Sequence, residues 1–236
     1  GDYSYLDGLV MPVTCYHIRA PFYYSRSESL VPTTHRIDFP KALERRGTKE
    51  YVVKLFALFQ KWLEELQGCC ITEDALRQSI QTYNTNRRLM RSIYELRKAD
   101  NPPLNGVEAL EMVLSSQLTA KEEHNVWLSD WLKELGEKKS KNESKSRLMI
   151  IGSVIDKSEV IELIESQGGI VVTDELCTGT RYFWDDVDEN DDPLTALARR
   201  YLDKVNCSCM IAGDRRFRHI EKMISQFNVQ GAVIVH

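Results

Sequence analysis

The sequence predicts an α/β protein in which parallel-sheet units are joined by a helical segment. Two patterns support this prediction. Residues 147–236 alternate short apolar runs with helical repeats, which is the arrangement of βαβ units in a parallel sheet. Residues 37–146 instead repeat apolar side chains at three- and four-residue spacing, which is typical of amphipathic helices. With 236 residues, 42% of them hydrophobic, the chain is long enough to bury a core in one large domain or two smaller ones.

Residues 1–36 are predicted to form the end of a first α/β domain. An apolar stretch, Leu6–Thr14, is interpreted as a strand that runs into a loop, with Cys15 just past its end. The aromatic stretch that follows, residues 20–34, contains two prolines and is predicted to be irregular. The predicted strand has no sheet to join in this segment, so we expect the chain to begin inside a domain.

The helical segment is predicted to span residues 37–146. The first helix ends at Gly68, and Thr72 is predicted to cap the start of the second, which stops before two prolines. The predicted helices cover residues 51–66, 73–96, 106–114 and 121–135. A polar connector without apolar residues, 137–145, is predicted to mark a domain boundary.

Residues 147–236 are predicted to form the first part of a second, Rossmann-like α/β domain. Strands are expected at 147–151, 170–173 and 232–235, and helices at 158–166, 193–205 and 217–227. Asp192 and Pro193 suit the N-cap and the first position of one of these helices. A parallel sheet normally continues from a strand into a covering helix, but the sequence ends just after its last strand. We therefore expect a chain that is cut at both ends.

Charge and composition disfavour several functional classes. A net charge of −4 gives no general electrostatic case for binding nucleic acid. No apolar run approaches the roughly 20 residues of a membrane span, and no secretion signal is present, so we expect a cytoplasmic protein with reduced cysteines. The sequence has neither a glycine-rich dinucleotide fingerprint nor a phosphate-loop lysine motif, which disfavours bound NAD or ATP.

Two charged stretches are interpreted as solvated surface. Residues 185–192 are strongly acidic but lack the glycine and terminal glutamate of a calcium-binding loop. A polar, mostly basic face on the second predicted helix is formed by Asn86, Arg87, Arg88, Arg91, Arg97 and Lys98. Contact with a phosphorylated cofactor is an alternative for this face, although a solvated helix face is the more ordinary interpretation.

Two cysteines share a sequence context that suits a metal site. Cys15 and Cys177 each follow an apolar strand and precede an aromatic loop. The carboxyl end of a parallel strand is where open α/β sheets usually present their chemistry. Two such loop ends facing across a cleft would form a soft, thiolate-lined site, which suits an iron–sulfur cluster better than a hard cation. The residues alone leave a metal ligand, a nucleophile and an ordinary core or loop cysteine open for both.

The other cysteines and one histidine are weaker candidates. Cys207 and Cys209 form a C-x-C whose thiols would share one face of a short strand, but no second Cys or His pair stands near them. Cys69 and Cys70 follow the glycine that ends a helix, and ordinary packing or surface exposure explains them. His17 lies two residues after the first candidate ligand, where it could donate a hydrogen bond to a bound acyl oxygen or to sulfur. A loop histidine without such a role is the simpler interpretation.

Several segments match a known family in order across nearly the whole chain. They are IQTYNTNRRLMRSIYELRKADNPP at 80–103, RLMIIGSVID at 147–156, GGIVVTDELCTGTRYF at 168–183, LARRYL at 197–202, NCSCM at 206–210 and FNVQGAVIVH at 227–236. Together they resemble the 2-hydroxyacyl-CoA dehydratase and benzoyl-CoA reductase family, of the 2-hydroxyglutaryl-CoA dehydratase D-component type. No single segment is specific, but the ordered set is.

The resemblance implies an oxygen-sensitive, cytoplasmic iron–sulfur enzyme subunit with two α/β domains plus helices. Dehydratases of this family remove water from 2-hydroxyacyl-CoA thioesters. An ATP-dependent iron–sulfur activator protein supplies one electron, which makes a ketyl radical anion on the thioester carbonyl and expels the hydroxyl group. The reductases use related electron injection on an aromatic ring, and both need a site that excludes water. The resemblance also implies an acyl-CoA substrate and a second homologous subunit in a homo- or heterodimer.

By position, the resemblance implies that Cys15 and Cys177 are two of the three cysteines that hold a [4Fe-4S] cluster in each subunit. The family's third cysteine follows a strand like Ala232–Val235, so it would come after His236 and the chain as given would lack it. Tyr16 stands where many members have aspartate. This departure leaves open a double-cubane relative, a reductase or electron-transfer protein with an eight-iron cluster and no acyl-CoA substrate. Its extra ligands would come from Cys69, Cys70, Cys207 or Cys209. A folded segment that binds no cluster is the third hypothesis.

Overall fold

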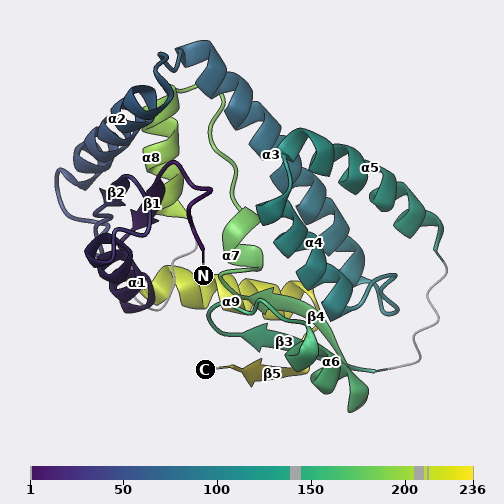
Figure 1. Ribbon diagram of the computed structural model, residues 1–236. Helices are drawn as coiled ribbons and strands as arrows, with labels where there is room; N and C mark the ends of the chain where they lie inside the picture. The colour runs from purple at the N-terminus through teal and green to yellow at the C-terminus, as the bar shows by residue number, and fades with distance from the viewer. Residues whose placement is uncertain (1, 139–144, 205–209, 212, 236) are drawn as a thin grey trace. The chain divides into compact units, whose positions relative to one another are not determined.

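The computed structural model describes residues 2–138, 145–204, 210–211 and 213–235 (Figure 1). Helices alternate with parallel strands, which confirms the predicted α/β class. The chain forms two compact units. The first unit comprises Gly1–Gln78, Val187–Asp203 and Ser208–Ala212, and the second unit comprises Ser79–Asp186, Lys204–Cys207 and Gly213–His236. The domain limits proposed at residues 36 and 146 stay a prediction, and most of the predicted connector lies outside the described residues.

The first unit begins with a parallel pair of strands joined by a helix. These elements are β1 (Leu9–Pro12), α1 (Tyr16–Ser27) and β2 (Thr34–Ile37). Two predictions are therefore wrong: residues 20–27 of the aromatic stretch are helical rather than irregular, and the first strand does have a partner. Residues 28–33 form neither helix nor strand, as predicted. A parallel pair needs a crossover connection, which a helix supplies. Burial of Phe22, which is 1% exposed, stabilises that helix, while Pro21 within it removes only one backbone donor.

Two helices of the first unit pack against each other and bury an apolar cluster. They are α2 (Thr48–Gln67) and α8 (Pro193–Asp203). The cluster consists of Leu43, Val52, Ala198 and Leu202. The predicted helix ends are confirmed. Gly68 closes α2 in a left-handed conformation with φ of 70°, and Asp192 Oδ2 accepts a 2.9 Å hydrogen bond from the backbone N–H of Thr195.

A long helix, α3, begins in the first unit and continues into the second, where it packs with α4 and α5. Their bounds are Glu73–Glu95, Gly106–Leu118 and Lys121–Glu137, and a 3₁₀ turn, η1 (Leu96–Lys98), extends α3. Thr72 caps α3 as predicted, because its Oγ1 accepts a 3.2 Å hydrogen bond from the backbone N–H of Ala75. The apolar spacing that predicted these helices places Met90, Ile93 and Leu128 in their common core.

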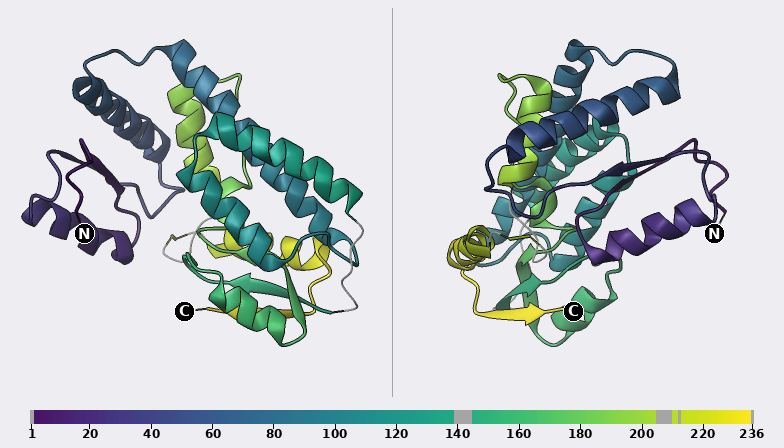
Figure 2. Two further views of the ribbon diagram at one scale, coloured as in Figure 1. Left: turned by 45° about the vertical axis from the view of Figure 1, so that its right-hand side comes forward. Right: turned by 90° about the vertical axis from the view of Figure 1, so that its left-hand side faces the viewer.

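The second unit also contains a three-stranded parallel sheet in the order β4-β3-β5. Its strands are β3 (Ser146–Ile151), β4 (Gly169–Glu175) and β5 (Gly231–Ile234), and the helices around it are α6 (Glu159–Ser166), α7 (Thr180–Phe183) and α9 (Gly213–Gln226). Alternate strand residues bury opposite faces. Ile150 and Val171 pack towards α4 and α6, whereas Met149 and Val172 pack towards α9. Figure 2 shows α6 (green) and α9 (yellow) on opposite sides of the sheet.

The basic face predicted on α3 is not simply solvated. Asn86 and Arg97 are each 1% exposed, so neither belongs to a solvated surface. Arg88 and Arg91 both form 2.8 Å ion pairs with Asp186, which belongs to the acidic stretch. The prediction failed because a polar side chain does not show in the sequence whether its partner is water or another buried group.

Candidate functional site

The clearest candidate site is the segment that leaves β4, residues 174–181, called here the Cys177 turn. Strand β4 ends at Glu175, two residues after the predicted end, and Leu176 is buried. The next residue, Cys177, is an exposed cysteine. Its backbone N–H donates a 2.9 Å hydrogen bond to the carbonyl of Ser153, in the loop after the neighbouring strand β3. The turn therefore presents a thiol at the carboxyl edge of a buried parallel sheet.

Asp174 holds this turn together. Its Oδ1 accepts hydrogen bonds from the backbone N–H groups of Thr180 at 2.8 Å and Leu176 at 3.2 Å. Its Oδ2 accepts a 2.6 Å hydrogen bond from the Tyr94 hydroxyl on α3. Burial, and then the charge of Asp174, raise the pKa of Tyr94 well above its ordinary value, so the phenol stays protonated and remains a donor.

Two neighbouring residues leave the turn little freedom. A Cβ atom on Gly179 would lie 1.9 Å from Asp174 Oδ1, so only glycine fits there. Thr178 Oγ1 donates to the carbonyl of Ile155 at 2.8 Å and accepts from its N–H at 3.1 Å. The backbone on both sides of Cys177 is thus fixed by buried contacts while the thiol itself is exposed.

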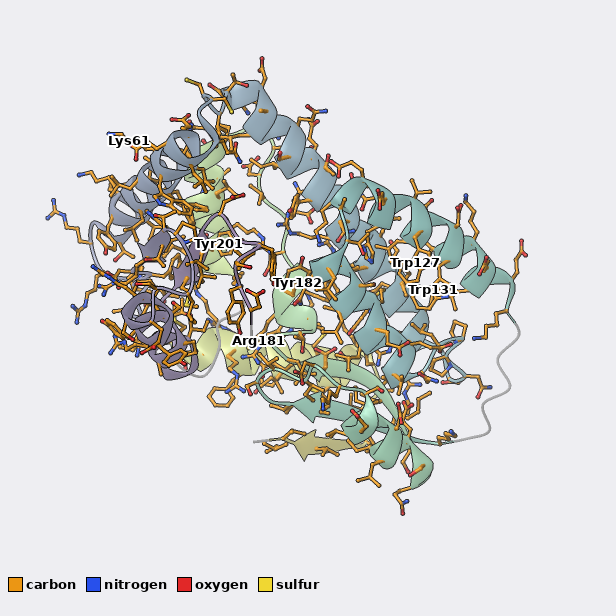
Figure 3. The ribbon with its side chains drawn as sticks, viewed as in Figure 1. Lys61, Trp127, Trp131, Arg181, Tyr182 and Tyr201 are labelled. Carbon is orange, nitrogen blue, oxygen red and sulfur yellow. The ribbon has the colours of Figure 1, made fainter. Side chains whose placement is uncertain are left out.

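A buried charge cluster lies at the base of the turn. Glu175 is fully buried and accepts two hydrogen bonds from Arg216 of α9, at 3.0 and 2.8 Å. Arg181 forms a 3.2 Å ion pair with the same carboxylate and also donates to the Gly152 carbonyl. Figure 3 labels Arg181 and its neighbour Tyr182. Two guanidinium groups thus share the buried Glu175 carboxylate, and these ion pairs fix the base of the turn.

Cys15 occupies a simpler setting in the first unit. It is the N-cap residue of α1, three positions after β1 ends, and its thiol is free and half-buried. The N-terminus of a helix favours negative charge because its first backbone N–H groups have no partners within the helix. Cys15 thus follows a parallel strand, as predicted.

The remaining sequence candidates are described only in part. Cys69 and Cys70 are exposed free cysteines between α2 and α3. The side chain of His17 and the residues Cys207 and Cys209 lie outside the described part of the chain. Across the described residues, no three His, Cys, Asp or Glu side chains gather in a way that would hold a metal ion.

Sequence reasoning missed most residues that support the Cys177 turn. Asp174 and Glu175 stand only three and two positions before Cys177, and an acidic pair at the end of an apolar strand was a usable signal. Tyr94 and Arg216 come from distant helices, and nothing in their local sequence connects them to this turn.

A protein-family model described as "2-hydroxyglutaryl-CoA dehydratase, D-component" matches residues 1–236. The chain belongs to this family. It is 28% identical over 239 residues to "Putative dehydratase subunit YjiM" of Escherichia coli (strain K12), a match that covers 99% of this chain and 62% of the relative. It is 29% identical over 210 residues to one of the benzoyl-CoA reductase subunits of Thauera aromatica, covering 84% of this chain and 52% of the relative.

A further relative is the (R)-2-hydroxyglutaryl-CoA dehydratase subunit beta of Acidaminococcus fermentans (strain ATCC 25085 / DSM 20731 / CCUG 9996 / CIP 106432 / VR4). It is 21% identical over 242 residues, covering 99% of this chain and 63% of the relative. The chain therefore spans between about half and two thirds of the length of these curated relatives. All three are named as subunits. Over the described residues, every helix is too short or too polar to cross a membrane.

Proposed function

We propose that this chain forms part of an iron–sulfur subunit that acts on a CoA thioester, as a 2-hydroxyacyl-CoA dehydratase or an aryl-CoA reductase. Cys15 and Cys177 are proposed as two ligands of its [4Fe-4S] cluster. The observation that carries the proposal is the exposed thiol of Cys177 on a turn fixed by buried contacts. An exposed cysteine in such a turn is suited to binding a metal, because metal ligands must be held in place before the metal arrives.

The donor chemistry fits an iron–sulfur cluster. Thiolates are the soft ligands that these clusters prefer, and neither candidate cysteine is in a disulfide. When bound, such a cluster would supply one-electron reduction of the substrate. The chain's own part would be to hold the two thiolates and to offset negative charge. The N-terminus of α1 would do the latter at Cys15, and the guanidinium groups of Arg181 and Arg216, both paired with Glu175, lie at the base of the turn that carries Cys177.

Substrate and partners follow from the family as proposals. The names of relatives include lactoyl-CoA, (R)-phenyllactyl-CoA, (R)-2-hydroxyglutaryl-CoA and benzoyl-CoA, which are all CoA thioesters. We therefore propose an acyl-CoA substrate, a second homologous subunit, an ATP-dependent iron–sulfur activator and a cytoplasmic location. Subunits of dehydratases and of a reductase are among these relatives, so the family supports either dehydration or reduction as the reaction.

Metal analysis of the full-length protein after anaerobic reconstitution tests the proposal. About four irons and four sulfides per chain are expected for one [4Fe-4S] cluster. Cys177→Ser should abolish or sharply lower this content and change the electron paramagnetic resonance spectrum of the reduced protein. Cys69→Ser is the matched control, because that cysteine is also exposed, and it should leave the iron content unchanged.

Other results would contradict the proposal in distinct ways. About eight irons per chain, together with loss of iron in Cys69→Ser, would support the double-cubane alternative. No bound iron in the full-length protein would support a folded segment without a cluster. Full iron content in Cys177→Ser would exclude Cys177 as a ligand.

A further inference from the structure

A small cavity in the second unit borders the Cys177 turn. Its volume is about 10 Å³, close to the smallest that holds one water molecule. Side chains of α4, α6 and the sheet form its apolar wall. Four polar residues also line it: Tyr94, Arg97, Asp174 and Thr178. A cavity of this size with several polar groups is suited to one small polar molecule.

Arg97 brings unpaired hydrogen-bond donors to this cavity. The side chain is 1% exposed, and its Nη2 donates to the carbonyl of Val171. The guanidinium carbon lies 4.6 Å from the centre of the Tyr94 ring. Its Nε and Nη1 have no hydrogen-bond partner among the described residues. Buried charged donors are costly to leave unpaired, so these two groups require an acceptor.

Asp174 offers an acceptor on the same cavity. Its Oδ1 already accepts two backbone hydrogen bonds, whereas its Oδ2 accepts only that of Tyr94 in the described structure. Each carboxylate oxygen has about two acceptor positions, so Oδ2 retains one. Thr178 Oγ1 is already engaged with Ile155 as both donor and acceptor. Arg97, which has unsatisfied donors, and Asp174, which has a spare acceptor, therefore line the same cavity.

We propose that this cavity binds one ordered water molecule, which accepts a hydrogen bond from Arg97 and donates one to Asp174. Water fits because it is both donor and acceptor. An anion would meet the carboxylate of Asp174, and a larger molecule would exceed the volume. The water would tie η1, which carries Arg97, to the Cys177 turn. This inference does not depend on an iron–sulfur cluster and can be tested on metal-free protein.

The direct test is a crystal structure of the full-length, metal-free protein from crystals soaked in bromide, at a resolution that shows ordered water. The expected result is a density peak about 2.7–3.2 Å from an Arg97 nitrogen and from Asp174 Oδ2, without an anomalous bromide signal. A bromide signal would show an anion site instead. An empty cavity, or a direct pair between Arg97 and Asp174, would also overturn the proposal.

Two variants distinguish the effect of the water on the Cys177 turn from the effect of the direct hydrogen bond between Tyr94 and Asp174. Arg97→Lys keeps the charge but loses the planar fork of donors, so the peak should disappear. The backbone amides of Leu176 and Thr180 should then exchange hydrogen about fivefold faster, because Asp174 loses one of its supports. Tyr94→Phe removes the hydroxyl and leaves Arg97 in place, so the peak should remain.

The amide of Ile150 in the centre of the sheet is the internal control, and its exchange should be unchanged in both variants. A peak that persists in Arg97→Lys with unaltered exchange at Leu176 and Thr180 would overturn the proposed bridge. The wild-type crystal structure decides the question even if a variant does not fold.

Discussion

The two units differ in the kind of side chain that they bury. Among the described residues, the polar side chains buried in the first unit are Ser25, Thr48 and Arg200. Those buried in the second unit are Asn84, Asn86, Arg97, Ser116, Lys121, His124, Arg147, Thr173, Asp174, Glu175, Thr178, Thr180, Arg181 and His219. The first unit thus depends mainly on apolar packing, whereas the second also depends on directional hydrogen bonds and ion pairs. Such contacts fix geometry more narrowly than apolar packing does.

The same contrast separates the two proposed ligands. Cys15 is placed by the start of a helix, and no side-chain hydrogen bond caps that helix. Cys177 is placed by Asp174, which draws on a tyrosine 80 residues away. We therefore expect the Cys177 turn to tolerate few substitutions, and the predictions below test how far this dependence on buried polar groups extends.

The largest effect is expected for Gly179→Ala. The new Cβ atom would lie 1.9 Å from Asp174 Oδ1, so the turn must move or Asp174 must leave its partners. The free energy of unfolding should fall by about 3 kcal/mol, measured by urea denaturation. Gly136→Ala in α5 is the matched control, since nothing lies within 4 Å of its Cβ position, and it should change stability by less than about 1 kcal/mol. Equal effects would contradict the rigid turn.

A smaller effect is expected from the pH dependence of the buried network around His124. Its Nδ1 lies 2.7 Å from Asn86 Nδ2 and its Nε2 lies 3.0 Å from Ser115 Oγ. Burial, and then the charge of Lys121, lower the pKa of His124 from 6.5 to about 4. Between pH 4 and pH 6.5, His124 binds a proton in the unfolded chain but not in the folded chain. The contribution of neutral His124 to the free energy of unfolding is therefore fully present above pH 6.5 and is lost towards pH 4. This contribution is on the order of 2 kcal/mol.

The variant His124→Gln isolates this contribution, because its side chain does not titrate. Unfolding free energies of both proteins should be measured between pH 7 and 4. The difference between the two curves removes the contributions of His35 and His219, whose pKa values are also lowered by burial. Parallel curves would show that His124 adds nothing to the acid sensitivity of the second unit.

Much of the fold could be predicted because its signals are local. Apolar spacing identified α2 to α6 and the strands of the second sheet, and single residues such as Gly68 and Asp192 identified helix ends. Helix α1 and strand β2 were missed. Pro21 and the aromatic residues around it are typical of irregular chain, and a parallel partner strand is recognised only through its pairing.

The position of the candidate site could be predicted from the sequence, but the residues that hold it in place could not. The strand before Cys177 begins with the apolar run Gly169–Val172, so the place of the thiol near its carboxyl end followed from the sequence. The contacts of Tyr94 and Arg216 join residues far apart in the chain. Arg97 was assigned to a solvated face because its charge favours exposure, and only the fold shows the cavity that it lines.

The smallest effect is expected at the surface of the first unit. Lys61 on α2 lies 3.8 Å from Glu65, with the two side chains 72% and 66% exposed. Figure 3 shows Lys61 on the outer side of that helix. Water and salt screen such pairs, so Lys61→Ala should lower the free energy of unfolding by less than about 0.5 kcal/mol, with little further change in high salt. A loss as large as that of Gly179→Ala would mean that charge pairs also hold the first unit together, and the contrast between the two units would fail.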